Sequence, residues 1–193
     1  MGSLFPEYDS DLATRHQALL TKVVQRRKEV TVFEDFLATK TNWLTAPAST
    51  RYHLCEPEGL LRHSIGVAET LLQLRATLAP DLSEESAVIV GLYHDVGKVG
   101  LPGKPYYIPN PNQWQRENRG IPYAINPEVV YMDIATRSLF LITPNISLTP
   151  EEAQAIRYHD GQYIDENRGV AHRECRLTLL LQFADNWTAS ILE

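Results

Sequence analysis

The stretch Leu92-Tyr93-His94-Asp95-Val96-Gly97-Lys98 decides how this chain is interpreted, because it places a histidine and a carboxylate directly after an apolar helix. Ser83 is a candidate N-cap for that helix, and residues 87–92 are so apolar that we expect burial on most sides. An unpaired carboxylate is costly to bury. A divalent cation compensates its charge and accepts an imidazole nitrogen beside it. The stretch therefore predicts a metal site at the end of a buried helix.

Two residues elsewhere in the chain are candidates to complete this site. His63 falls in the first turns of a helix expected from Leu60 to Leu78, whose apolar residues recur at helical spacing. Asp185 lies next to the apolar face of a final helix expected from about His172 to Leu192. Taken singly, each residue also has an ordinary structural explanation. A lone buried histidine is more often hydrogen-bonded within the core, and an aspartate can simply pair with an arginine.

The three motifs together resemble the HD-domain phosphohydrolase superfamily, whose pattern is a histidine, a His-Asp doublet and a distant aspartate that bind one metal. The matching strings are Leu60-Leu61-Arg62-His63-Ser64, the stretch 92–98 and Phe183-Ala184-Asp185. The resemblance covers roughly residues 45–193 and implies an all-α fold, a compact helical HD-domain bundle. Residues 49–53, followed by Glu58-Gly59-Leu60-Leu61, are similar to the start of the HD domains of bacterial 3′-to-5′ exoribonucleases and relaxase-associated proteins.

The resemblance implies four metal ligands and a metal-activated water. His63, His94, Asp95 and Asp185 would hold a divalent ion, and nitrogen and oxygen ligands without thiolate suit Mn, Fe, Ni, Zn or Mg. The ion would bind a phosphate oxygen and a water of lowered pKa, which gives Asp95 a catalytic role as well as a ligand role. Relatives with two metals commonly carry paired histidines where this chain has Tyr158-His159-Asp160-Gly161, a departure that weighs against a second metal.

Four residues near these motifs are candidates to act on the substrate. Lys98 lies three positions after Asp95 and would place its ammonium near the phosphate if the helix continues. The alternative is an exposed lysine favoured by the helix dipole. His159 is a candidate catalytic acid or base, with a structural role as the alternative. His53 and Arg62 lie beside the first motif and are candidates for substrate binding, and a surface position is an equal alternative for each.

The chain is expected to be a single HD-type domain over residues 1–193, in which residues 1–44 form a helical extension packed on the bundle. Within the extension, apolar residues at helical spacing predict one helix from Leu12 to Glu29, after cap candidates that include Asp9. Thr31 is a candidate cap for a short second helix. We find no repeat or linker that would divide the chain.

Residues 99–127 contain six prolines and lack the helical spacing of apolar residues, which indicates an irregular loop or hairpin insertion. Tyrosines in this insertion either stack on a base or pack on their own domain; they are Tyr106, Tyr107 and Tyr123. A helical pattern resumes over residues 129–141. The string Thr149-Pro150-Glu151-Glu152 then predicts the start of a helix that runs into His159.

The composition excludes several classes of protein. The net charge of −6 and the pI near 5.5 argue against a broad basic surface for duplex nucleic acid. The two cysteines, Cys55 and Cys175, form neither a metal-binding pair nor a disulfide framework, which fits a reducing, cytoplasmic setting. No apolar run approaches the length of a membrane-spanning helix, so no membrane association is expected.

The resemblance predicts a metal-dependent phosphohydrolase that cleaves a phosphate ester of a nucleotide or of a nucleic-acid end. The expected partner is a small phosphorylated substrate, a nucleotide above all, with a single-stranded nucleic-acid end as a further possibility. One alternative is a non-catalytic, metal-containing domain that binds or senses nucleotides. Another is an oxygen-using di-iron enzyme on the same scaffold, which needs more ligands than the sequence clearly offers.

Overall fold

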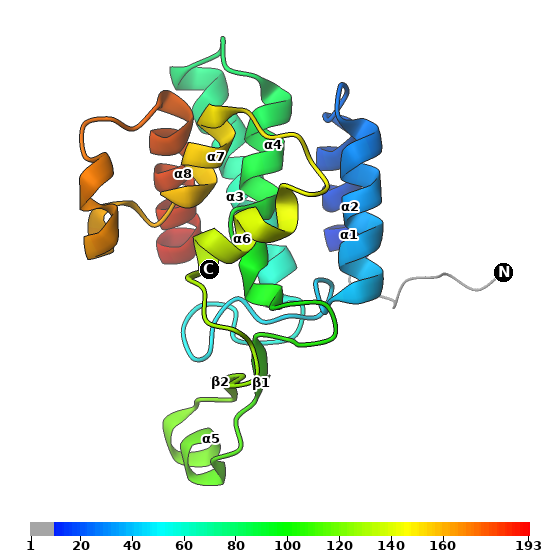
Figure 1. The fold of residues 1–193 in the computed structure, drawn as a ribbon, viewed down its shortest axis with the longest axis vertical. Helices are drawn as coiled ribbons and strands as arrows, with labels where there is room; N and C mark the ends of the chain where they lie inside the picture. The colour runs from blue at the N-terminus through cyan, green and yellow to red at the C-terminus, as the bar shows by residue number, and fades with distance from the viewer. Residues whose placement is uncertain (1–9) are drawn as a thin grey trace, which may run out of the picture.

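Helices α3 (Gly59–Leu78) and α4 (Glu84–Tyr93) form the centre of the structure, a computed structural model that describes residues 10–193 (Figure 1). The two helices pack closely along their length. Gly91 permits this approach, because a Cβ atom there would lie 2.6 Å from Cα of Ala68. The close contact holds together the two helices that carry the histidines of the first and second motifs.

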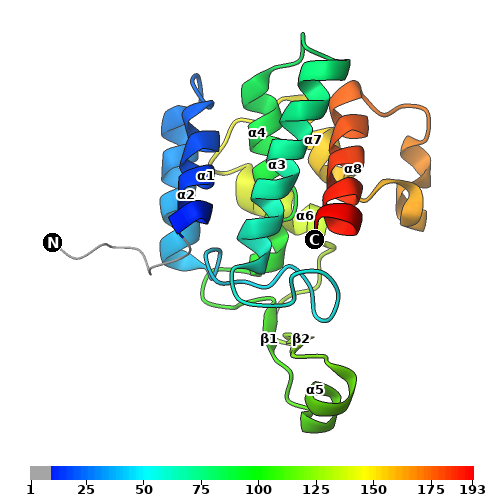
Figure 2. The same ribbon diagram turned by 180° about the vertical axis from the view of Figure 1, so that it is seen from behind.

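The other helices lie on the two sides of this central pair, as Figures 1 and 2 show from opposite directions. Their bounds are α1 (Ser10–Thr21), α2 (Arg27–Lys40), α6 (Ile134–Ile142), α7 (Pro150–Arg157) and α8 (Arg176–Trp187). Three 3-10 turns and a π turn complete the helical part: η1 (Val96–Val99), η2 (Gly161–Tyr163), η3 (Asp165–Val170) and η4 (Thr188–Leu192). The predicted all-α fold is confirmed. Within residues 10–193, no helix combines the length and the apolar character that a membrane span requires.

Aromatic rings join the N-terminal helices to the central pair. Phe33 of α2 meets the ring of Tyr93 edge to face, with 5.1 Å between the ring centroids. Trp43 lies on the same tyrosine at 6.3 Å, and all three side chains are fully buried. Because Tyr93 directly precedes His94, this cluster of rings holds the end of α4 in place.

The predicted single helix from Leu12 to Glu29 is wrong, because the chain turns between α1 and α2. The backbone N–H groups of Val24 and Gln25 both donate to Oε2 of Glu85, at 2.7 Å. These bonds satisfy backbone donors that a helix would have used internally. Their acceptor lies on α4, far along the chain, so the periodicity of the segment itself could not show the break.

The predicted caps have different outcomes. Ser83 caps α4 through its side chain, and Thr149 caps α7 in a reciprocal capping box with Glu152, as predicted. Thr31 is not a cap, because it lies inside α2 and its hydroxyl donates to a backbone carbonyl one turn earlier. Asp9 lies outside the described residues.

Two later helices start further along the chain than predicted. The helix expected over residues 129–141 begins at Ile134, where the side chain of Asp133 accepts a hydrogen bond from the backbone N–H of Thr136. The final helix begins at Arg176: His172 has a left-handed backbone conformation with φ of 64°, and Cys175, the residue before the helix, is extended. Cap residues and backbone turns, which apolar spacing does not report, therefore set these two starts.

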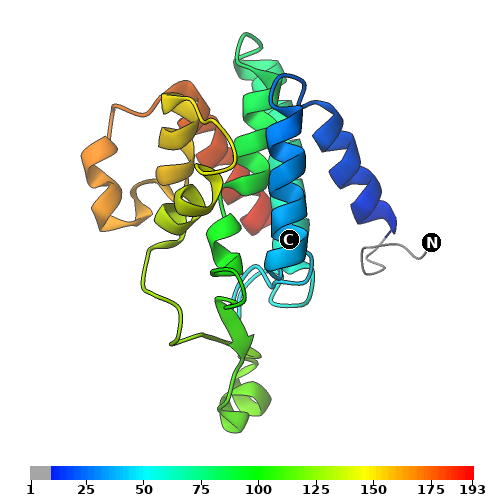
Figure 3. The same ribbon diagram turned by 45° about the vertical axis from the view of Figure 1, so that its right-hand side comes forward.

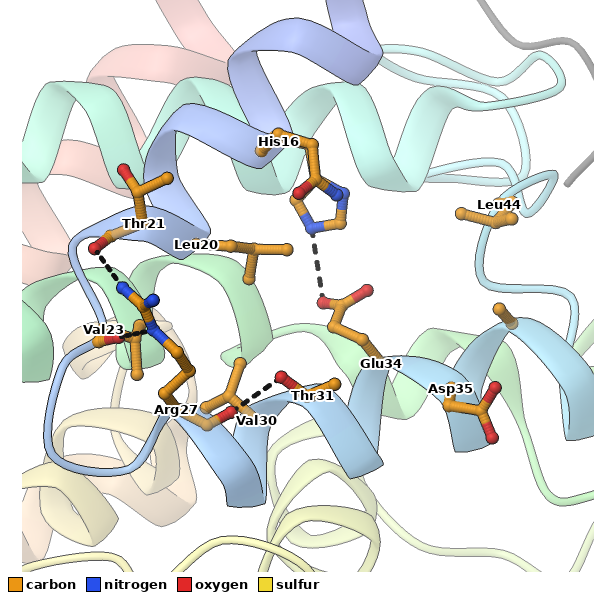
Figure 4. Close-up of a pocket in the computed structure, with 12 residues that line it drawn as sticks. His16, Leu20, Thr21, Val23, Arg27, Val30, Thr31, Glu34, Asp35 and Leu44 are labelled. Carbon is orange, nitrogen blue, oxygen red and sulfur yellow. Dashed lines mark hydrogen bonds and ion pairs between the residues drawn. The ribbon is translucent and has the colours of Figure 1, made fainter. Parts of the chain in front are cut away.

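Helices α1 and α2 run at an angle to each other (Figure 3). A cavity of about 440 Å³ lies between them, and Figure 4 shows His16 of α1 facing Glu34 of α2 across it. Nε2 of His16 lies 3.3 Å from Oε1 of Glu34, which also accepts a 2.6 Å hydrogen bond from the hydroxyl of Tyr93. These polar contacts link both N-terminal helices to the end of α4.

The proline-rich insertion is a hairpin, one of the two forms predicted. Strand β1 (Tyr107–Pro109) pairs antiparallel with β2 (Tyr123–Ile125), with Tyr107 opposite Ile125. The connection contains a short helix, α5 (Gln113–Arg119), which was not predicted and is capped by the side chain of Asn112. In Figure 1 the hairpin projects from the lower end of the helical bundle, with α5 at its tip.

Candidate metal centre

Four secondary-structure elements bring the predicted ligands to one place. His63 lies in the first turns of α3, and His94 follows the last residue of α4. Asp95 comes next and precedes the turn η1, while Asp185 lies in the second half of α8. The side chains of both histidines and of Asp95 are almost completely buried.

The first group of potential ligands consists of His63, His94 and Asp185, whose ligand atoms all lie within 4.8 Å of one another. Oδ1 of Asp185 lies 3.2 Å from Nε2 of His63 and 3.8 Å from Nε2 of His94. The three residues come from α3, α4 and α8. The arrangement therefore forms only when these three helices pack together.

A second group shares His94 with the first and adds Asp95 and His159. Oδ2 of Asp95 lies 3.8 Å from Nε2 of His94, and Oδ1 of the same carboxylate lies 3.4 Å from Nε2 of His159. His159 follows the end of α7, and its ring meets that of His94 with 4.9 Å between centroids. The residue predicted as a catalytic acid or base thus lies against the predicted ligands.

The orientation of His94 tests whether this cluster fits a cation. Nδ1 of His94 lies 2.9 Å from the carbonyl oxygen of Gly91, so the Nδ1–H donates there and Nε2 faces the two aspartates. Burial lowers the pKa of His94 to about 4, so the ring is neutral near pH 7 and Nε2 carries a lone pair. Among residues 10–193, this buried nitrogen has no hydrogen-bond partner. An acceptor nitrogen beside two carboxylates fits a divalent cation.

Lys98 makes the shortest charged contact of the cluster. Its Nζ lies 2.5 Å from Oδ2 of Asp95, across the turn η1. Burial by itself would lower the pKa of Lys98, but the Asp95 carboxylate raises it above its ordinary value. Burial would likewise raise the pKa of Asp95, and the Lys98 ammonium together with His159 holds it well below its ordinary value. Both groups are therefore charged near neutral pH.

A cavity of about 680 Å³ adjoins the cluster, a size typical of small-molecule sites. The predicted residues that line it are His53, His63, Asp95, Lys98, His159 and Asp185. Its other walls include neutral polar side chains of α8 and of the turns η2 and η4, among them Gln162, Gln182, Asn186 and Ser190. Charged groups and neutral hydrogen-bonding groups thus share one solvent-accessible space.

Arg62 is not brought to this cavity. Its guanidinium pairs with the exposed carboxylate of Glu56 at 3.1 Å, and it lines a different cavity together with Arg15. Neighbouring residues of a helix point about 100° apart, so His63 can face the cluster while Arg62 faces away. We therefore assign Arg62 no role in substrate binding.

The tyrosines of the insertion are also absent from the described lining of the cavity. Tyr106 instead packs under the guanidinium of Arg137, 4.2 Å from the ring centroid. Tyr107 lies nearer the cluster: burial raises its pKa to about 12, and the charges of Lys98 and Asp95 contribute smaller, opposing effects. These contacts are those of tyrosines that pack on their own domain.

Two buried residues of α6 hold the turn that follows the His-Asp doublet, and the sequence interpretation missed both. Arg137 is fully buried and donates to the carbonyl oxygen of Gly97, while the hydroxyl of Ser138 accepts from the N–H of Gly97. A Cβ at position 97 would lie 2.3 Å from the carbonyl oxygen of Ile134, so only glycine fits there. The signal in the sequence was an arginine beside a serine within the mainly apolar segment 134–142.

A family model described as HD domain matches residues 60–189, well over half of the chain. The chain belongs to the HD domain family. HD domains are generally metal-dependent phosphohydrolases, and at that level the family agrees with a His/Asp cluster able to hold a metal. No curated protein and no solved structure matched the HD-domain chain.

Proposed function

We propose that this HD-domain protein is a metal-dependent phosphohydrolase that cleaves a phosphate ester of a nucleotide or of a nucleic-acid end. His63, His94, Asp95 and Asp185 would hold the divalent cation. The observation that carries the proposal is the buried, unpartnered Nε2 of His94, which faces two carboxylates within the described part of the chain. The adjoining cavity supplies room for a small substrate.

The ligand set favours hard or borderline cations. It offers imidazole nitrogens and carboxylate oxygens and no thiolate, which suits Mn, Fe, Ni, Zn or Mg. When bound, such a cation polarises a phosphate oxygen and lowers the pKa of a bound water to near neutrality. The protein's part is to hold the ligands in place and to leave one side open toward the cavity.

Lys98 and His159 are the groups we assign to the substrate. Lys98 lines the cavity, and its ammonium is proposed to bind a phosphate oxygen. Burial by itself would lower the pKa of His159, but the hydrogen bond to Asp95 and the charge of Asp160 raise it to about 10. Without a metal the ring is then protonated near pH 7, and we propose that His159 gives the proton of its Nε2–H to the leaving oxygen. His53 lines the same cavity and is proposed to contact the substrate.

The substrate is proposed to be a nucleotide or the end of a single strand. The net charge of −6 and the modest cavity favour a small nucleotide. The short string at residues 49–53 favours the strand-processing relatives instead. We also propose that residues 1–193 form one HD-type domain with residues 1–44 as its extension, supported by the contact of Phe33 with Tyr93.

The test combines metal analysis with a screen for phosphate release. Purified protein is assayed for bound metal and then, with each candidate metal added, for hydrolysis of nucleotides, cyclic nucleotides and generic phosphate esters. The expected result is release that depends on metal and is lost in the Asp185→Ala variant. Metal and nucleotide binding without any hydrolysis would instead support the non-catalytic sensor.

Salt dependence distinguishes the two substrate classes. Binding of a single strand releases counterions, so the logarithm of its affinity falls by roughly 0.7 per contacted phosphate for each tenfold rise in salt. A mononucleotide contacts few phosphates and should show a shallow dependence. KM for a mononucleotide and for an oligonucleotide is therefore measured over a range of salt concentrations. A steep slope and a lower KM for the oligonucleotide would overturn the small-nucleotide preference.

A further inference from the structure

The last residue of the sequence lies against the metal-facing histidine of α3. The π turn η4 packs on α3, and in Figure 2 the end marked C lies near the lower part of that helix. Oε1 and Oε2 of Glu193 lie 3.1 and 3.2 Å from Nδ1 of His63. Only 8% of the Glu193 side chain is exposed. A carboxylate 130 positions after His63 in the chain thus contacts Nδ1 of its ring, the nitrogen that faces away from the other ligands.

The turn that carries Glu193 is anchored to α3. Thr188, at the start of η4, is 1% exposed, and its hydroxyl lies 3.2 Å from that of Thr70. Gly66 leaves room for the turn, because a Cβ there would lie 3.0 Å from Cγ2 of Thr188. The position of the Glu193 carboxylate therefore follows from buried contacts of the turn as well as from its own contact with His63.

His63 differs from the other two histidines of the cluster in what its Nδ1 contacts. In His94 and His159, Nδ1 donates to a backbone carbonyl three residues earlier, at 2.9 and 2.8 Å. For His63 the partner is the Glu193 carboxylate. A carboxylate that accepts the outer N–H of a ligating histidine selects the tautomer, orients the ring and makes the other nitrogen a stronger donor to the metal.

We propose that Glu193 is a positioning residue of the metal site: its carboxylate accepts the Nδ1–H of His63 and directs the Nε2 lone pair of that ring toward His94 and Asp185. The inference rests on the proposed function, because it assigns the second shell of that same metal site. Glu193 is not a ligand of the cation proposed between His63, His94 and Asp185, since its carboxylate contacts the opposite edge of the His63 ring; with His53 and His63 it forms a separate group of potential ligands.

The test measures metal affinity directly. Co²⁺ is titrated into metal-free protein, and binding is followed by calorimetry and by the visible absorption of the bound ion. Glu193→Ala should weaken Co²⁺ binding by about 10-fold to 100-fold. Glu193→Gln keeps an oxygen that can accept the Nδ1–H but lacks the charge, so its Co²⁺ affinity should fall less than that of Glu193→Ala. Glu69→Gln, a half-buried carboxylate of α3 paired with Arg15, is the matched control and should bind as the parent does.

A second measurement separates positioning from a structural role. The thermal unfolding of the metal-free proteins should differ little between parent and Glu193→Gln, and ¹⁵N NMR of the Zn²⁺-loaded parent should show His63 protonated at Nδ1. A loss of stability in the metal-free variants that accounts for the loss of affinity would overturn the inference, as would a Zn²⁺-loaded His63 protonated at Nε2.

The outcomes for the parent and for the variants are distinguishable. If the parent itself binds no Co²⁺, Zn²⁺ or Mn²⁺, the proposed metal site fails, and this inference fails with it. If the parent binds and Glu193→Ala binds equally tightly, only the positioning role is overturned. If Co²⁺ affinity falls from the parent to Glu193→Gln and again to Glu193→Ala, while the Gln variant keeps its stability, the result supports both the metal site and the positioning role.

Discussion

The ammonium of Lys98 lies 2.5 Å from Oδ2 of Asp95, and the same carboxylate faces the predicted metal ligands His63 and His94. A lysine that neutralises a proposed ligand stabilises the protein without metal, because a buried carboxylate without a partner is costly. It also competes with a cation for that carboxylate. Under the proposed function, Lys98 would therefore link metal affinity, stability and substrate binding at one contact.

Lys98→Met tests this link. The variant should retain metal at least as tightly as the parent, because the competing ammonium is gone. Its kcat should fall by about 10²-fold to 10³-fold, since one positioned charge on the substrate phosphate is lost. Its metal-free form should unfold at a lower temperature, and added metal should restore stability. Metal affinity, phosphate release and thermal unfolding are measured on parent and variant together. Full activity of Lys98→Met would remove Lys98 from the site.

Asp95→Ala should lose metal retention and activity together. Asp95 is proposed as a direct ligand beside His94, so its loss leaves an incomplete coordination shell and removes negative charge that attracts the cation. Asp165→Ala, which removes an exposed carboxylate paired with Arg168, is the control and should keep both properties. The measurement is metal content after dialysis, followed by phosphate release. Retention of metal by Asp95→Ala at the level of the control would contradict the assigned ligand.

Outside the site, Arg26 pairs with two buried carboxylates. Its guanidinium donates twice to Glu152 at 2.6 Å and once to Glu85 at 2.8 Å, which ties the turn before α2 to the starts of α7 and α4. Arg26→Ala should lower the free energy of unfolding by about 3–5 kcal/mol, because it removes the charged partner of two buried carboxylates, which then keep hydrogen bonds from backbone N–H groups. Lys22→Ala breaks the exposed pair with Glu84 and should cost about 0–1 kcal/mol. If denaturant titrations give the same loss of unfolding free energy for both variants, the burial of the Arg26 ion pairs does not increase their contribution to stability.

The same pair predicts how stability depends on pH. Burial alone would raise the pKa of Glu152, but the hydrogen bonds from Arg26 lower it below its ordinary value of 4.5. A group whose pKa is lower in the folded state contributes stability above its unfolded pKa and loses that contribution as pH falls through the folded value. The parent should therefore lose stability below about pH 4.5. Glu152→Gln should show a shallower loss in unfolding titrations over the same acidic range.

Arg137→Lys should destabilise the turn that follows the His-Asp doublet. The arginine donates to the carbonyl oxygens of Gly97 and Met132 and lies on the ring of Tyr106, a planar geometry that an ammonium cannot reproduce. We expect a lower melting temperature and weaker metal binding, because the turn carries Lys98 and adjoins Asp95. Arg168→Lys on the surface is the control. If Arg137→Lys matches the parent in melting temperature and in metal binding, the turn does not depend on the contacts of the Arg137 guanidinium.

Local patterns in the sequence predicted the helices that carry the cluster. Apolar spacing predicted α3 and α4, and the cap residues Ser83 and Thr149 predicted where α4 and α7 begin. Helical spacing and capping act over a few residues, so a sequence contains them directly. The candidate ligands followed from residue types and from the family resemblance, and the fold brings them within reach of one another.

Residue spacing and residue types were therefore enough to predict the helical class, the ends of the central helices and the kinds of side chain in the cluster. They could not predict that the chain turns before α2, where its backbone binds the carboxylate of Glu85, that Arg62 faces away from the cavity, or that Glu193 contacts Nδ1 of His63. Each of these depends on a contact between segments far apart in the chain, or on the direction of a side chain around a helix. Neither is set by the local spacing of residues, because both arise only when the helices pack.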